Sequence, residues 1–169
     1  MVTTDDLAAI ISAQQIGKAY ARNLWVINRQ TEGLTHAESL LQPPMRGNCL
    51  NWILGHLAVH RDYVLAALGQ EKVLGDTVIA RYGRESAPII GEGEGVLPLE
   101  QLLAALEKGQ ERIDAALDQL TPADLVREVT VGRTMSLSEA LFFYYFHDTY
   151  HTGQTEPLRQ LAGKNDKIL

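Results

Sequence analysis

Cysteine, positive charge and long apolar runs are all scarce in this sequence, and each shortage excludes a class of protein. The single cysteine, Cys49, excludes an intrachain disulfide framework and suits a reducing compartment. The net charge of −6 argues against sequence-independent binding to nucleic acid and against electrostatic docking on anionic membranes. The densest apolar run, residues 140–146, is far shorter than the ~20 residues that span a bilayer. The start of the chain is acidic where a signal peptide would be basic, so we expect a cytoplasmic protein.

The apolar residues that are present suffice for one compact domain. The chain has 169 residues, of which 46% are hydrophobic, enough for a single core but scarcely for two. The sequence contains no internal repeat. We therefore expect residues 1–169 to form a single domain.

Four segments carry apolar residues at the three- and four-residue steps typical of amphipathic helices. These segments span about residues 4–32, 49–68, 98–120 and 136–161. Polar residues that favour helix N-termini precede three of them: Thr4, Asn48 and Ser136. The pattern predicts an all-α four-helix bundle.

The connection between the second and third predicted helices is long. Residues 70–97 have no helical periodicity and no clear strand pattern, and six of them are Gly or Pro at scattered positions. We expect an irregular segment that covers a functional site, and its length allows the helices on either side to run parallel. Residues 123–135 predict an extended connector or a short hairpin.

Four of the five histidines form two pairs spaced four residues apart, namely His56 with His60 and His147 with His151. Residues four apart are separated by about 40° around a helix and about 6 Å along it, so each pair projects from one face. Burying imidazoles without partners costs on the order of 1–3 kcal/mol each, and a shared divalent metal would offset this cost. The alternatives are a pair that faces solvent or two histidines that hydrogen-bond to a neighbouring helix.

His56 lies on the apolar side of its predicted helix, in line with Ile53. Alone, it would be interpreted as a core histidine, but together with His147 and His151 it can reach one point inside a bundle. Three roles are open to His60: a fourth metal ligand, a base beside the metal, or a residue at the rim of the bundle. The last two are favoured. The fifth histidine, His36, is expected to be solvated.

The string His147-Asp148-x-x-His151 is similar to the H-E-x-x-H motif of metalloproteases. We reject this interpretation, because aspartate reaches less far than glutamate as a general base. The third ligand of such sites also lies downstream, and no histidine follows His151.

Two strings resemble the DinB/YfiT-like metalloenzymes: NWILGHL over residues 51–57 and HDTYHTGQ over residues 147–154, with LRQL following at 158–161. The resemblance implies a four-helix bundle of up-down-down-up order, and in many members a homodimer. It also implies a divalent metal, most often nickel or zinc, held by His56, His147 and His151. Most members have no assigned activity, and relatives include thiol-dependent transferases and isomerases that use bacillithiol or mycothiol.

Three neutral ligands would leave a coordination position open, as in catalytic rather than structural metal sites. Such a position either lowers the pKa of a bound water or binds a thiol as thiolate. The sequence therefore predicts a metal-dependent enzyme, a hydrolase or a thiol-dependent transferase, that acts on a small molecule. The rival hypotheses are a non-catalytic metal-binding module for stress response or sensing, and a purely structural homo-oligomer.

Four further residues near the two strings are open to a functional interpretation. Gln154 is expected to orient substrate or to bond between helices, and Gly153 to allow close helix approach. Tyr144 is a candidate donor to a bound anion or a packing residue. Cys49 is interpreted as a packed thiol rather than a nucleophile.

Overall fold

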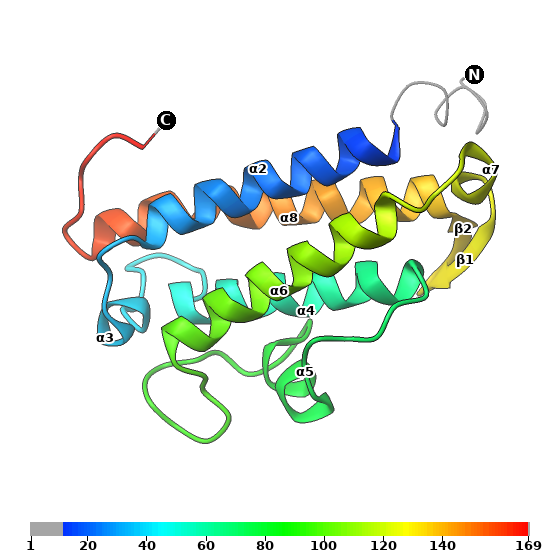
Figure 1. Cartoon of the computed structure of the whole chain (residues 1–169). Helices are drawn as coiled ribbons and strands as arrows, with labels where there is room; N and C mark the ends of the chain where they lie inside the picture. The colour runs from blue at the N-terminus through cyan, green and yellow to red at the C-terminus, as the bar shows by residue number, and fades with distance from the viewer. Residues whose placement is uncertain (1–11, 169) are drawn as a thin grey trace.

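Helices make up most of this computed structural model, which describes residues 12–168 of the chain (Figure 1). The four long helices are α2 (Ala13–Thr31), α4 (Leu50–Ala67), α6 (Leu99–Leu117) and α8 (Leu137–Leu161). The short elements are α3 (His36–Ser39), α5 (Asp76–Tyr82), α7 (Pro122–Leu125) and the strands β1 (Glu128–Val131) and β2 (Arg133–Ser136). The predicted helical class is confirmed, with the addition of one small sheet.

Each long helix packs against two others around a common core. α2 contacts α6 and α8, and α4 contacts the same two helices from the opposite side. In Figure 1, α2 and α8 run from right to left, whereas α4 and α6 run from left to right. The segment between α4 and α6 crosses back along the bundle, as the long connection predicts.

α4 is the most enclosed of the four helices. Fifteen of its 18 residues are buried, including the fully enclosed Leu54, Leu57 and Leu65. The buried residues include polar ones such as Arg61 and Asp62, so α4 is covered on most sides. α6, α8 and α5 supply the cover. Side chains on α4 are therefore held in fixed positions, and this rigidity matters for its histidines.

Two predicted helix starts change in the structure. The predicted cap Thr4 and residues 4–11 lie outside the described residues, and within them Ser12 forms a capping box with Gln15 at the start of α2. The cap of α4 is Cys49, so the prediction of Asn48 is wrong by one residue. The predicted helix start at Ser136 is confirmed, and there Ser136 forms a capping box with Glu139.

The prediction of an irregular segment over residues 70–97 is wrong in part, because α5 lies within it. α5 has only seven residues between Gly75 and Gly83, too few for a helical period to be seen in the sequence. The short helices α3 and α7 are missed for the same reason. The hairpin is confirmed: β1 and β2 pair antiparallel, and Gly132 takes the positive φ of 81° that their turn requires.

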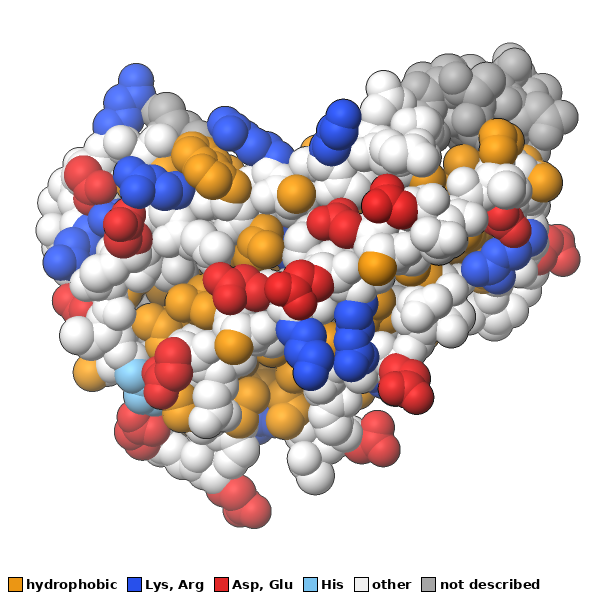
Figure 2. All heavy atoms as spheres, in the orientation of Figure 1, with side chains coloured by type: hydrophobic (Ala, Val, Ile, Leu, Met, Phe, Trp, Pro, Cys, Tyr) orange, Lys and Arg blue, Asp and Glu red, His pale blue; other side chains and the backbone are white. Residues whose placement is uncertain are grey.

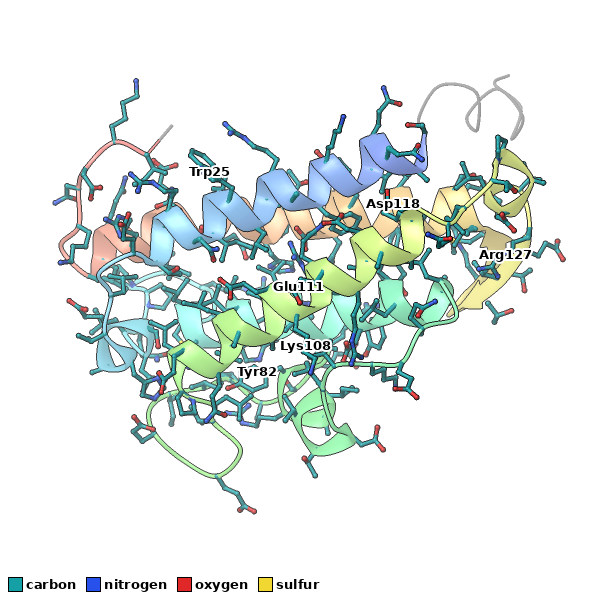
Figure 3. All side chains as sticks on the ribbon, in the orientation of Figure 1. Trp25, Tyr82, Lys108, Glu111, Asp118 and Arg127 are labelled. Carbon is teal, nitrogen blue, oxygen red and sulfur yellow. The ribbon has the colours of Figure 1, made fainter. Side chains whose placement is uncertain are left out.

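The surface carries charges of both signs. On the face formed by α2 and α6, acidic and basic side chains are interspersed and form no large patch of one sign (Figure 2). Lys108 and Glu111, close together on the outer side of α6, are an example (Figure 3). Within the described part of the chain, no helix has the length and apolar character needed to cross a membrane.

Candidate metal centre

Three imidazoles from two helices meet between α4 and α8. His56 comes from α4, while His147 and His151 lie one turn apart on α8, and one nitrogen of each lies within 4.8 Å of the other two. The Nε2 atoms of His56 and His147 are 3.3 Å apart. Tetrahedral bonds of about 2.0–2.1 Å place two ligand atoms about 3.3 Å apart, so this spacing fits a common ion.

Hydrogen bonds fix the tautomers of two of these rings. Nδ1 of His56 donates to the carbonyl oxygen of Tyr82 at 2.8 Å, and Nδ1 of His151 donates to Oε1 of Gln154 at 2.8 Å. Each bond leaves the Nε2 lone pair of its ring free. Metal-ligating histidines have partners of this kind, which orient the ring and raise its basicity. Gln154 is thus shown to bond within its own helix, to His151.

Burial keeps the three imidazoles neutral. Burial, together with the neighbouring imidazoles, lowers the pKa of His56 to about 4 and that of His147 to about 3. Burial lowers the pKa of His151 as well. The three rings are therefore uncharged near pH 7, which is the form that binds a divalent metal.

His60 lies beside the three histidines and is not on the rim. Its ring stacks on that of His147, with centroids 3.6 Å apart and planes 15° from parallel. The lone pair of an imidazole nitrogen lies in the plane of the ring, so two stacked rings cannot both direct lone pairs at one ion. Both ring nitrogens of His60 are buried without a partner among the described residues, and burial lowers its pKa to about 2.

The crossover segment reaches the site through Tyr82. This residue, labelled in Figure 3, is fully buried at the end of α5. Its hydroxyl donates to Oδ1 of Asn51 at 2.9 Å and accepts from the backbone N–H of Leu97 at 2.8 Å. A Cβ on Gly55 would lie 2.0 Å from its ring, so only glycine lets this ring pack against α4. The segment thus positions the carbonyl that orients His56.

The sequence interpretation missed both Tyr82 and Asn51. The available signal is Gly55, since glycine inside a helix costs about 1 kcal/mol relative to alanine and needs a reason such as close packing. Gly55 therefore indicates that another part of the chain lies against this turn of α4. Nothing in the spacing identifies which residue does so.

A buried ion pair lies directly behind the histidines. Nε of Arg61 donates to Oδ2 of Asp148 at 3.0 Å, and both side chains are at most 2% exposed. Oδ1 of Asp148 accepts from Asn23 of α2 at 2.9 Å, and Arg61 also donates to Gln110 of α6 at 3.1 Å. The network joins all four long helices next to His147. Asp148 therefore points into the bundle rather than at the site, in agreement with the rejection of the metalloprotease motif.

The remaining candidates near the site have structural roles. Cys49 is fully buried, its thiol donates to the carbonyl of Ile89 at 3.5 Å, and burial raises its pKa, so the packed-thiol prediction is confirmed. Tyr144 is buried, with its ring centroid 5.8 Å from that of His60. The prediction for Gly153 is wrong, because a Cβ there would meet nothing within 4 Å.

His36 is also not simply solvated. Its Nδ1 accepts from the backbone N–H of Leu99, at the start of α6, at 3.2 Å. Its Nε2 lies 2.9 Å from Oε1 of Glu92 in the crossover segment. This histidine therefore joins the crossover segment to α6, away from the other four.

The profile of the DinB superfamily matches residues 5–155. The chain belongs to the DinB superfamily. Among solved structures, a conserved protein from Enterococcus faecalis superposes with a TM-score of 0.70 at 16% identity, over 91% of this chain and 99% of that one. A mutant of mycothiol-dependent maleylpyruvate isomerase superposes with a TM-score of 0.61 at 16% identity, over 86% of this chain. The match spans 61% of the isomerase, and no curated protein sequence matches this DinB-superfamily chain.

Proposed function

We propose that this chain is a metal-dependent enzyme that acts on a small molecule, with His56, His147 and His151 as the metal ligands. The observation that carries the proposal is the convergence of three imidazole nitrogens within 4.8 Å. Two of the rings already have the tautomer that ligation needs, and burial keeps all three neutral. Three protein ligands are the number typical of catalytic sites.

When bound, a divalent ion here would act as a Lewis acid and would either lower the pKa of a water or hold a thiol as thiolate. The protein supplies position and polarity. Tyr82 and Gln154 hold two of the rings in place. His60 carries one N–H donor and one acceptor nitrogen with no partner among the described residues, and we assign it the role of hydrogen-bonding to the bound substrate.

The metal and the cosubstrate are narrower parts of this proposal. Imidazole suits zinc, nickel, copper and iron, and we favour nickel or zinc. A low-molecular-weight thiol is the cosubstrate we favour, because a structural neighbour is a mycothiol-dependent isomerase. The reaction would then be a thiol-dependent transfer, with metal-dependent hydrolysis as the other type that such a site supports.

We also propose that the protein is a homodimer. Four aromatic residues on α8 are each at least half exposed: Phe142, Phe143, Phe146 and Tyr150. Phe146 lies three or four positions from each of the other three, so they share the outer face of the helix. Exposed apolar surface of this kind marks interaction sites. A single domain, the up-down-down-up order and a cytoplasmic location complete the proposal. The packing of each long helix on two others supports the single domain, and the helix directions in Figure 1 support the order. The lone buried thiol of Cys49 supports the location.

Turnover by metal-loaded protein tests the enzymatic part. Nickel- and zinc-loaded protein would be assayed on panels of esters, amides and thiol conjugates, beside His151→Ala and the matched control His36→Ala. We expect turnover on at least one panel that is lost in His151→Ala and kept in His36→Ala. Stoichiometric metal without any turnover would favour the non-catalytic module instead.

A further inference from the structure

A cavity of about 550 Å³ lies beside the histidine cluster, between the loop of residues 43–48 and the C-terminal part of α8. Two lining residues connect it to the cluster. Gln154 bonds to His151 through its carbonyl oxygen, and Ile53 lies one helical turn before His56. A volume of several hundred Å³ next to a reactive centre is typical of a pocket for a small organic ligand.

The walls of this cavity are mainly apolar. Pro43, Met45, Pro157 and Leu161 contribute to them, so the body of a ligand that fits here is apolar. The walls come from two parts of the chain that are far apart in sequence, the loop before α4 and the end of α8. The cavity is therefore formed only when these two helices are packed together, as they must be for the histidines to meet.

The lining of the cavity carries positive charge only. Arg46 is the one charged residue among those that line the cavity, all of which belong to the described part of the chain. Within that part, its guanidinium makes no ion pair. The chain as a whole has more acidic residues than basic ones, 21 against 15. The lining of this cavity has the opposite balance, with one unpaired cation and no carboxylate. It favours a ligand that carries a negative charge.

Gln154 adds a second donor on the side of the histidines. Its Oε1 accepts from His151, which fixes the amide and leaves the N–H groups of Nε2 for a ligand in the cavity. The cavity thus offers a cation on the loop, apolar walls, and amide donors next to the imidazoles. A planar guanidinium matches a carboxylate with two parallel hydrogen bonds, and one cation balances a single negative charge.

We propose that this cavity binds the substrate of the metal centre and that the substrate is an organic monocarboxylate with an apolar body. The carboxylate lies on Arg46, and the reacting end points toward Gln154 and the histidines. This inference rests on the proposed function, since it concerns the same site. It adds the chemical class of the substrate and names Arg46 as the residue that selects for it.

Binding of simple acids and their uncharged amides tests the inference. Octanoate and phenylacetate would be titrated into the full-length protein by calorimetry, beside octanamide and phenylacetamide, with metal-free and zinc-loaded protein. The variants are Arg46→Met, which keeps the apolar stem, and Arg46→Lys, which keeps the charge. Arg84→Met is the matched control, because Arg84 is 87% exposed and does not line the cavity.

We expect each acid to bind about tenfold more tightly than its amide, in both metal-free and zinc-loaded protein, a difference of about 1.4 kcal/mol. Arg46→Met should abolish this preference, Arg46→Lys should keep part of it, and Arg84→Met should keep all of it. Three results would overturn the inference: no binding of either acid, equal binding of acid and amide, or a preference that persists in Arg46→Met because the metal holds the carboxylate.

The zinc content of each sample separates this inference from the proposed function. Wild-type protein and Arg46→Met should both take up zinc in equal amount. A wild type that takes up no zinc contradicts the metal centre, while a preference for acids that depends on Arg46 in that same protein would still identify the cavity as a carboxylate site.

Discussion

The carbonyl oxygen of Tyr82 accepts a hydrogen bond of 2.8 Å from Nδ1 of His56. This bond joins the crossover segment, the least regular part of the fold, to a histidine on its most enclosed helix. It directs Nε2 of His56 toward His147 and His151. The bond exists because Gly55 leaves room for the Tyr82 ring against α4.

Gly55→Ala should destabilise the protein and weaken metal binding. The new Cβ would lie 2.0 Å from a ring that is fully buried, so the crossover segment must shift and the His56 bond with it. We expect a loss of about 1–3 kcal/mol in the free energy of unfolding, measured in urea, because overpacking costs that much. Gly153→Ala is the control: its Cβ meets nothing, and the helix should gain up to ~1 kcal/mol. Equal stability of the two variants would contradict the packing argument.

Gln154→Leu should reduce metal affinity without a comparable loss of stability. It removes the acceptor that orients His151, and loss of such a partner typically costs about 10- to 100-fold in affinity. Competition with a chromophoric chelator measures the change. Gln154→Glu keeps an acceptor at this position and should restore most of the affinity. If Gln154→Leu binds zinc as tightly as the wild type, the hydrogen bond has no orienting role.

Asp148→Asn should be strongly destabilising. It leaves the Arg61 guanidinium, at most 1% exposed, without its counter-ion, and breaking a buried ion pair costs about 3–5 kcal/mol. The matched control is Glu32→Gln, which breaks the exposed pair with Arg29 and should cost less than about 1 kcal/mol. Urea unfolding of both variants checks the contrast. A small effect of Asp148→Asn would show that the network is not central to the fold.

The metal-free protein should lose stability as the pH falls below about 6.5. Burial lowers the pKa of His56 to about 4 and that of His147 to about 3, from 6.5 for an exposed imidazole. Between these values the unfolded chain binds protons that the folded chain does not, so the free energy of unfolding decreases as the pH is lowered. Above pH 6.5 the histidines are neutral in both states and this contribution vanishes. Urea unfolding from pH 7 to 5 measures this slope, and His56→Gln should make it shallower. A slope that is unchanged in His56→Gln would show that this ring is not held neutral by the fold.

The four long helices could be predicted from the sequence because each has an apolar face that repeats over several turns. α5 could not, since seven residues between Gly75 and Gly83 show less than two turns. The three histidines could be found because two of them lie one turn apart and the third lies on the apolar side of another helix. Histidine is also rare enough for such spacing to be informative.

The residues that surround the histidines could not be predicted from the sequence, for physical reasons. The partner of His56 is a backbone carbonyl, which every residue possesses, so no residue type marks it. Arg61 and Asp148 lie 87 positions apart, and only the packing of α4 on α8 shows that they form a pair. The stacking of His60 on His147 depends on the rotation of both helices, which a helical period defines only coarsely.

The central claim is that His56, His147 and His151 hold one metal ion. Elemental analysis tests it most directly, on untagged protein purified without chelating resin or chelators, beside the double variant His147→Ala/His151→Ala and the control His36→Ala. We predict about one transition-metal ion per chain in the wild type and in His36→Ala, and none in the double variant. A wild type that is free of metal and takes up none when nickel or zinc is added would contradict the account.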